Sequence, residues 1–160
     1  MHATKNQDAV WAFIANALER SGVAMLMYVL ESEGSSPGRQ GFKMAVTGEG
    51  KMAGTVGGGI MEHKFVELAK VKIVDQSFDY ALHRQLHEKE SGLNHSGMIC
   101  SGRQVILLFK LEKQHLAVVR SIEESIETNG NEYLQITPGG IDLVRQPSAG
   151  DHFFEWKDDS

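Results

Sequence analysis

Residues 23–62 read VAMLMYVLESEGSSPGRQGFKMAVTGEGKMAGTVGGGIME, and they set the expectation for the whole fold. The first eight residues, 23–30, are continuously apolar, which is typical of a short strand that is buried on both faces. The stretch 34–59 then holds nine of the 17 glycines. At this density the backbone itself is shaped into turns, because glycine adopts positive φ freely. The segment therefore predicts a central strand followed by glycine-rich loops.

Periodic patterns outside this stretch predict that helices and strands alternate. Apolar residues recur at helical spacing in three segments, which are 4–20, 60–71 and 112–128. Residues 104–109 predict a second buried strand, and shorter strands are expected at 43–46, 78–82, 133–137 and 141–145. The fold class expected is α/β, a single layered domain over residues 1–160 with a mixed sheet flanked by about three helices. Residues 146–160 are expected to form a loose tail.

Composition excludes several classes of function. The 160 residues include 16 Lys+Arg and 21 Asp+Glu, a formal net charge of −5. A mildly acidic chain lacks the basic footprint of a general nucleic-acid binder, so no nucleic-acid partner is expected. No apolar run approaches a membrane span, so no membrane partner is expected. The single cysteine, Cys100, leaves no intrachain disulfide, which suits the reducing cytoplasm.

The glycine-rich stretch is the first candidate ligand site. A turn at Gly57–Gly59 directly precedes the predicted helix at Ile60, so backbone N–H groups and the positive end of the helix face one point, which favours an anion or a phosphate. Hydroxyl donors and positive charges in the same stretch add to this site: Ser35, Ser36, Thr55, Arg39 and Lys43. Glu62, in the first helical turn, either complements the helix dipole or takes part in binding. The alternative is two glycine-rich turns of a compact sheet, since neither a P-loop nor a dinucleotide fingerprint is present.

The second candidate segment surrounds Cys100. It reads Gly97-Met98-Ile99-Cys100-Ser101-Gly102 and directly precedes the second buried strand. Flanking glycines leave the thiol accessible, and a thiolate near a positive charge or a helix N-terminus becomes reactive or metal-binding. The alternative is that a lone cysteine serves as a small buried apolar residue.

Taken in order, these motifs resemble the XdhC/CoxI family of accessory factors for xanthine dehydrogenase-type molybdenum hydroxylases. The family pattern appears here as Gly34-Ser35-Ser36-Pro37, Gly41-Phe42-Lys43-Met44, Gly54-Thr55-Val56-Gly57-Gly58-Gly59 and Glu62. A family Cys-Gly-Gly appears as Cys100-Ser101-Gly102, so Ser101 departs from the pattern. The signature segments are 34–62 and 97–109, within a resemblance that covers about residues 8–110.

The resemblance implies a protein that handles molybdenum cofactor (molybdopterin) as cargo. Family members bind the cofactor and deliver it to an apo-hydroxylase, acting as chaperones more than as enzymes. The implied cofactor-binding residues are those of the glycine-rich stretch, Gly54 included, together with Cys100, Ser101 and Gly102. Thiolate is a soft ligand that suits molybdenum, so Cys100 is expected to contact the metal or to carry a transferable sulfur.

Two other functions remain open at this stage. One is a sulfurtransferase that carries a persulfide on Cys100, with a cysteine desulfurase as partner. The other is a nucleotide- or phosphate-binding regulatory module, because fold alone does not fix function. Full-length family members continue into a C-terminal Rossmann domain, which this chain is expected to lack. A small sheet with exposed edges also favours pairing into a homodimer.

Overall fold

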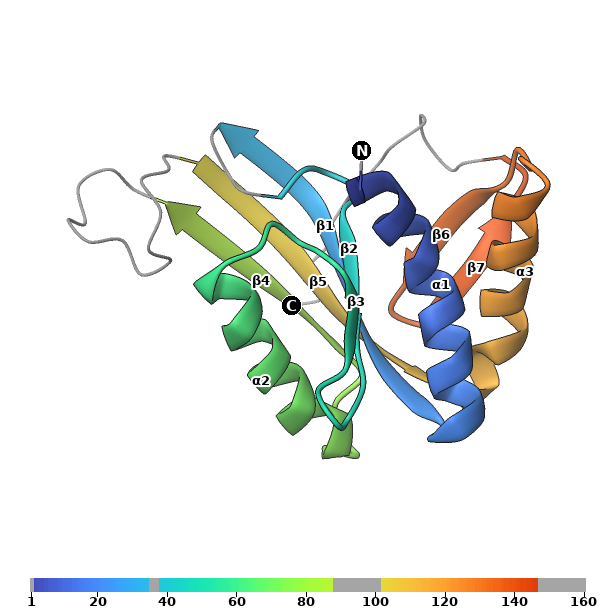
Figure 1. Ribbon diagram of the computed structural model, residues 1–160, viewed down its shortest axis with the longest axis horizontal. Helices are drawn as coiled ribbons and strands as arrows, with labels where there is room; N and C mark the ends of the chain where they lie inside the picture. Colours follow the sequence, from blue (N-terminus) through green and yellow to red (C-terminus); the bar gives the residue numbers. More distant parts are fainter. Residues whose placement is uncertain (1, 35–37, 88–101, 147–160) are drawn as a thin grey trace.

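The computed structural model describes residues 2–34, 38–87 and 102–146 (Figure 1). Strands β1 (Val23–Gly34), β2 (Lys43–Val46), β3 (Met52–Gly54), β4 (Tyr80–His87) and β5 (Gly102–Glu112) form one sheet in the order β3-β2-β1-β5-β4. The helices are α1 (His2–Arg20), α2 (Ile60–Val74) and α3 (Leu116–Glu127). A separate hairpin consists of β6 (Tyr133–Thr137) and β7 (Gly140–Val144). The α/β class with three helices is confirmed.

The sheet differs from the expected mixed arrangement, because every strand pair described in it is antiparallel. The expectation arose from the apolar run at 23–30, since continuous burial is most typical of parallel sheets. Here helices on both faces bury an antiparallel strand equally well. Strand β1 is central, between β2 and β5, and Met25, Leu26 and Met27 are all fully buried.

Two apolar clusters lie on opposite faces of the sheet. The α1 face carries Leu26, Leu107 and Phe109, packed with α1, α3 and the β6–β7 hairpin. The α2 face carries Met25, Met27, Val29, Ile106 and Leu108, packed against α2. Figure 1 shows α2 on one side of the sheet and α1 on the other. Burial of each large apolar side chain contributes about 1.5–3 kcal/mol, so these two clusters supply most of the driving force.

Gln7 of α1 fixes this helix to the glycine-rich stretch. Its Nε2 donates to the carbonyl oxygens of Lys43 and Thr55, both at 3.1 Å, and its Oε1 accepts from the Lys43 N–H at 2.5 Å. Gly54 lies beside this junction with φ +80°, and an added Cβ would approach the Lys43 carbonyl oxygen to 2.3 Å. Glycine is required there for both reasons.

The region after β5 differs from the expected element boundaries. A helix was expected from residue 112, but β5 continues to Glu112 and a short 3₁₀ helix (Lys113–His115) comes before α3. The His115 side chain accepts from the Glu112 N–H at 2.9 Å, which caps this turn. Within α3, Val119 and Ile122 are buried, whereas Ile126 is 38% exposed.

Candidate functional site

The loop between β3 and α2 is fastened to α2 by one carboxylate. Oε1 of Glu62 accepts hydrogen bonds from the Thr55 hydroxyl, from the Val56 N–H at 3.0 Å and from the Gly58 N–H at 2.8 Å. The Gly57 N–H donates in turn to Thr55 Oγ1 at 3.1 Å. We call this set of bonds the Glu62 latch. It holds residues 55–58 in one conformation above the α2 face of the sheet.

The latch changes the interpretation of the glycine turn. The amides of the Gly57–Gly59 turn were expected to face an external anion, but here the Gly58 N–H, together with that of the preceding Val56, donates to the chain's own carboxylate. A negative charge does sit at the start of α2, where the helix dipole favours it, and Glu62 provides that charge. A phosphate bound at these two amides would therefore have to displace Glu62.

Below the loop, three polar residues form a row across the sheet. Gln104 of β5 pairs in register with Ser32 of β1 on one side and with Gln85 of β4 on the other. Alternate residues share a strand face, and Ile106 and Leu108 of β5 lie in the α2-face cluster. Gln104 and its two partners therefore lie on the α2 face, in continuation of the apolar core.

Gln104 connects this row to the loop. Its side chain is fully buried, and its Nε2 donates to the Val56 carbonyl oxygen at 3.0 Å. Gly38 packs against the same place, because an added Cβ would meet Val56 O at 2.1 Å and Gln104 Nε2 at 2.5 Å. The Ser32 hydroxyl donates to the Gly38 carbonyl oxygen at 2.6 Å. Two glycine-rich segments thus converge on one buried amide.

The row also holds two buried acceptors with unmet hydrogen-bonding capacity. Within the described part of the chain, no donor pairs with Gln104 Oε1 or with Gln85 Oε1. Buried side-chain oxygens of this kind are uncommon, because each forfeits a hydrogen bond that it makes with water in the unfolded chain.

These groups lie at one end of the sheet, which we call the Gly34 end. There β1 ends at Gly34, β5 begins at Gly102 and β4 ends at His87. Gly102 pairs in register with Gly34 on one side and with His87 on the other. Gly102 is thus placed two residues from Gln104. Four of the predicted site residues, Ser35, Ser36, Cys100 and Ser101, lie outside the described residues.

The two predicted cations are not part of the latch. Arg39 is exposed in the loop between β1 and β2. Lys43 turns toward the α1 face, where its ammonium donates to the Gly41 carbonyl oxygen at 3.2 Å and lies 5.6 Å from the Tyr28 ring centroid. Burial lowers the pKa of Lys43, and the charge of Asp8 opposes that shift. Of the predicted set, the structure brings together Thr55, Gly57, Gly58 and Glu62, with Gly54 and Gly59 adjoining.

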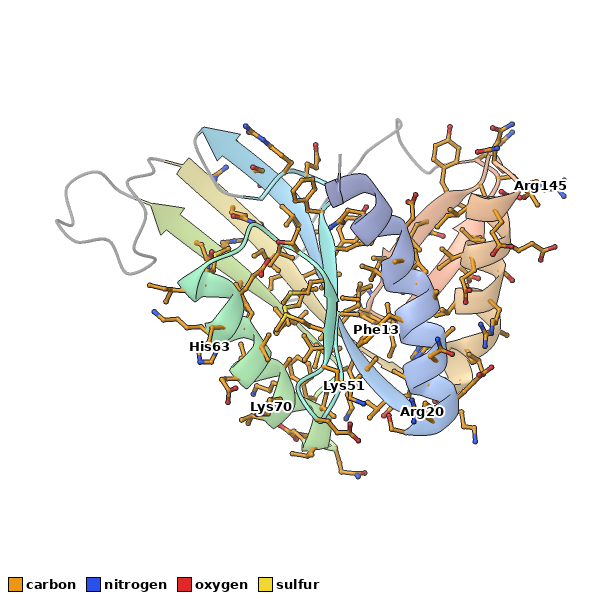
Figure 2. All side chains as sticks on the ribbon, viewed as in Figure 1. Phe13, Arg20, Lys51, His63, Lys70 and Arg145 are labelled. Carbon is orange, nitrogen blue, oxygen red and sulfur yellow. The ribbon has the colours of Figure 1, made fainter. Side chains whose placement is uncertain are left out.

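His83 lies two residues before Gln85 on β4, on the same face. Its ring meets the Phe65 ring of α2 edge-on, with centroids 5.6 Å apart. Burial lowers the pKa of His83, and the positive charge of Lys72 lowers it further. The neutral imidazole is therefore the form that fits this interface. By contrast, His63 is exposed on the outer side of α2 (Figure 2).

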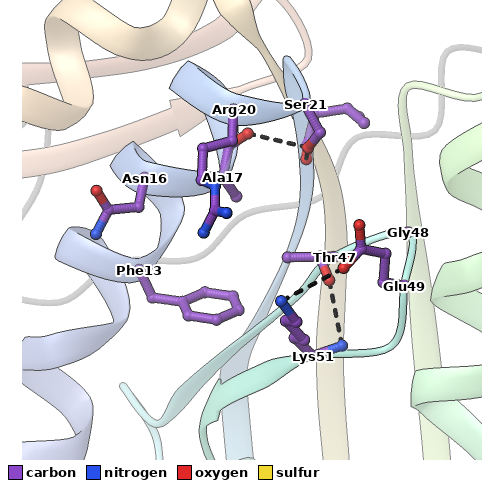
Figure 3. A pocket seen from close by; sticks show the side chains of 10 residues that line it. Phe13, Asn16, Ala17, Arg20, Ser21, Thr47, Gly48, Glu49 and Lys51 are labelled. Atoms are coloured by element: carbon purple, nitrogen blue, oxygen red, sulfur yellow. Dashed lines mark hydrogen bonds and ion pairs between the residues drawn. The ribbon is translucent and has the colours of Figure 1, made fainter.

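A groove of about 510 Å³ lies elsewhere, between the end of α1 and the β2–β3 turn. Phe13 and Arg20 of α1 face Thr47 and Lys51 across it (Figure 3). The groove includes Val23, at the start of β1, so it lies roughly 30 Å along that strand from Ser32 at about 3.3 Å per residue. It is therefore separate from the Glu62 latch.

Gln85 and Gln104 were not among the residues expected to form the site. The signal in the sequence was a single amide side chain at the start of the apolar run QVILLF. Gln85 gives no such signal, since it lies in a strand of mixed polarity. Among the described residues, no three His, Cys, Asp or Glu side chains gather as a metal site would require. None of the described helices combines the length and the apolar content needed to cross a bilayer.

Comparisons with known proteins agree with the resemblance seen in the motifs. A sequence model of the XdhC and CoxI family matches residues 17–78, which include the glycine loop and Glu62. No curated protein matches the chain in sequence. A crystal structure described as a xanthine dehydrogenase from Bacillus halodurans matches with a TM-score of 0.61 and 18% identity. The match covers 92% of this chain and 45% of that one.

The resemblance to the XdhC and CoxI family is thereby confirmed over residues 17–78. At 18% identity, the likeness to the solved structure establishes the fold alone, and this chain spans about 45% of the length of that neighbour.

Proposed function

We propose that this protein binds molybdenum cofactor as cargo and assists its insertion into a molybdenum hydroxylase of the xanthine dehydrogenase type. The family match supports this proposal, because it falls on the segment that forms the Glu62 latch. A structural neighbour described as a xanthine dehydrogenase adds support. The observation that carries the proposal is structural: the family-matched loop closes over a buried amide, Gln104, whose oxygen has no donor among the described residues.

The chemistry of the described residues matches one part of the cofactor. A pterin carries N–H donors on its pyrimidine edge, and buried amide oxygens such as Gln104 Oε1 accept from such donors. The phosphate group does not fit the amides of Val56 and Gly58 while Glu62 holds them. We therefore assign the pterin edge, and not the phosphate, to the Gly34 end of the sheet.

The residues of this chain have distinct proposed roles. Gln104 positions the heterocycle, and the latched loop of residues 55–58 excludes water from it. Cys100, two residues before β5, is the proposed contact with molybdenum, since thiolate is a soft ligand and this is the one thiol of the chain. The proposed partner is the apo-hydroxylase, and the proposed location is the cytoplasm.

Anaerobic loading tests the proposal. The protein is mixed with isolated molybdenum cofactor and passed through a desalting column, and molybdenum and pterin are then measured in the protein fraction. We expect both at close to one per chain, and loss of molybdenum retention in the Cys100→Ala variant. Absence of both from the wild-type fraction would refute the proposed function. Unchanged retention in Cys100→Ala would remove the thiol from the site.

A further inference from the structure

Two neighbouring hydrogen-bond acceptors lie at the Gly34 end of the sheet. They indicate which part of a ligand this chain recognises. Gln85 and Gln104 are directly opposed across β4 and β5. Side chains that oppose each other in this way have Cβ atoms about 4.5–5.5 Å apart. The Oε1 atoms of both are buried and lack a donor within the described residues. The sheet thus carries two neighbouring amide side chains, each with a buried oxygen that has no donor among the described residues.

The orientation of the Gln104 amide is fixed by its partner. The Val56 carbonyl oxygen can only accept, so the atom 3.0 Å from it must be the Nε2 donor. Exchange of the oxygen and the nitrogen would set two acceptors against each other. Gln104 Oε1 is therefore left for a second group, and that group has to be a donor.

The chemistry of the pair excludes several kinds of ligand. Two amide oxygens repel an anion, so neither a phosphate nor a carboxylate suits them. Two neutral amide oxygens also bring no negative charge, whereas Ca²⁺ and Mg²⁺ sites in proteins are built on carboxylates. A planar heterocycle with adjacent N–H groups on one edge supplies both donors without burying a net charge. The 2-amino-4-oxopyrimidine edge of a pterin, with its amino group beside a ring N–H, has this pattern.

We propose that Gln85 and Gln104 form the specificity pair of the site, with their amide oxygens accepting from the 2-amino and ring N–H groups of a pterin. This inference rests on the proposed function, since the pterin is that of the cargo. The pair selects the donor edge independently of any contact that Cys100 makes with the metal. Selection between heterocycles then depends on the exocyclic 2-amino group.

The Glu62 latch controls entry to the pair. Gln104 is covered by the backbone carbonyl of Val56 and by Gly38, which has no side chain. Gly58, in the same loop, has φ +86° and open space where a Cβ would stand. A heterocycle reaches the acceptors when residues 55–58 move away from Gln104, which requires the bonds to Glu62 to break, and these bonds re-form over the bound heterocycle, so that the amides of Val56 and Gly58 are again occupied.

Fluorescence titration tests this proposal, with unsubstituted pterin (2-amino-4-oxopteridine) as the probe. Lumazine, which has an oxygen in place of the 2-amino group, is the matched ligand control. We expect wild-type protein to bind pterin at least tenfold more tightly than lumazine. Gln85→Leu is expected to weaken pterin binding at least tenfold without lowering Tm, because it removes an unpaired acceptor and keeps the volume. Gln114→Leu, at an exposed position beyond the far end of β5, should leave binding unchanged.

Several results would overturn the assignment. Equal affinity for pterin and lumazine would do so, as would absence of pterin binding by the wild-type protein. A raised Tm with unchanged pterin affinity in Gln85→Leu would show that the pair holds only a buried water. Retention of molybdenum cofactor without selectivity for pterin over lumazine would refute the role of Gln85 and Gln104 and leave the proposed function intact. Selective pterin binding without cofactor retention would support the pair and refute the proposed function.

Discussion

Replacement of Glu62 by alanine should destabilise the protein more than loss of any exposed carboxylate. One oxygen of Glu62 accepts from the Thr55 hydroxyl and from the N–H groups of Val56 and Gly58. Hydrogen bonds to charged groups contribute about 1.5–3 kcal/mol each, and partial replacement by water reduces this to about 1 kcal/mol at a half-buried position. Glu62→Ala should therefore lower the free energy of unfolding by about 3 kcal/mol. At this chain length, that corresponds to a fall in Tm of about 6–12 °C.

Urea unfolding followed by circular dichroism measures this change directly. Glu67→Ala is the matched control, because Glu67 is exposed on the same helix and forms an ion pair with Lys70 at 3.4 Å. A surface pair of this kind contributes about 0.5 kcal/mol or less. Glu62→Gln keeps an acceptor oxygen and should cost about 1 kcal/mol, which separates loss of charge from loss of the acceptor. Equal destabilisation by Glu62→Ala and Glu67→Ala would show that the latch is not formed in solution.

Three further predictions follow from other contacts. Gly54→Ala should lower the free energy of unfolding, measured by thermal unfolding, by more than about 3 kcal/mol, because the added Cβ meets backbone atoms. Gly58→Ala has open space around the added Cβ, so it should cost only the backbone strain of about 1–2 kcal/mol. Equal losses in the two variants would contradict the loop geometry. Gln7→Ala removes three hydrogen bonds and should lower the free energy of unfolding, measured in urea, by about 3 kcal/mol. A loss below about 1 kcal/mol would show that Gln7 does not hold α1 to the glycine-rich stretch. Because the pKa of His83 is lowered in the folded protein, the unfolded chain binds protons more readily, and stability should fall as pH drops below about 6.5. His83→Gln should make stability depend less steeply on pH below about 6.5, whereas His63→Gln, at an exposed position, should leave this dependence unchanged. An unchanged pH dependence in His83→Gln would contradict the burial of the His83 ring.

Much of the architecture could be predicted from local patterns. The helical spacing of apolar residues over 4–20 predicted α1, and Val10, Ile14 and Leu18 of this stretch are fully buried. The apolar run at 23–30 predicted the central strand. Strand direction was not predictable from that run, because burial on both faces depends on how the helices pack and not on how the strands pair. The antiparallel pairing follows from long-range contacts that a single sequence does not reveal.

The candidate site was predictable only in part. The glycine motif correctly placed a turn that directs amides toward an anion, yet the anion those amides meet is Glu62 of the same chain. The spacing of four residues between Gly58 and Glu62 permits this contact but does not require it. Lys43 was expected beside the turn because it is close in sequence. Strand alternation instead places its side chain on the α1 face, beside Tyr28.

The buried amide pair lay beyond the reach of sequence patterns. Gln85 and Gln104 are separated by 19 positions, and only the register of β4 against β5 sets them opposite each other. A polar residue at the start of an apolar strand was the one available hint, and it applied to Gln104 alone. Polar groups that meet through tertiary structure carry no local periodicity, so such a pair is found only once the fold is known.

Hydrogen–deuterium exchange of the protein with and without molybdenum cofactor, under anaerobic conditions, tests the central claim most directly. If the cofactor is held at the Gly34 end of the sheet, peptides that cover residues 54–62 and 102–106 should exchange more slowly in its presence. The groove formed by α1 and the β2–β3 turn, which includes Thr47, Glu49 and Lys51, should exchange as before. Slowing confined to that groove, or unchanged exchange throughout the chain, would contradict the account.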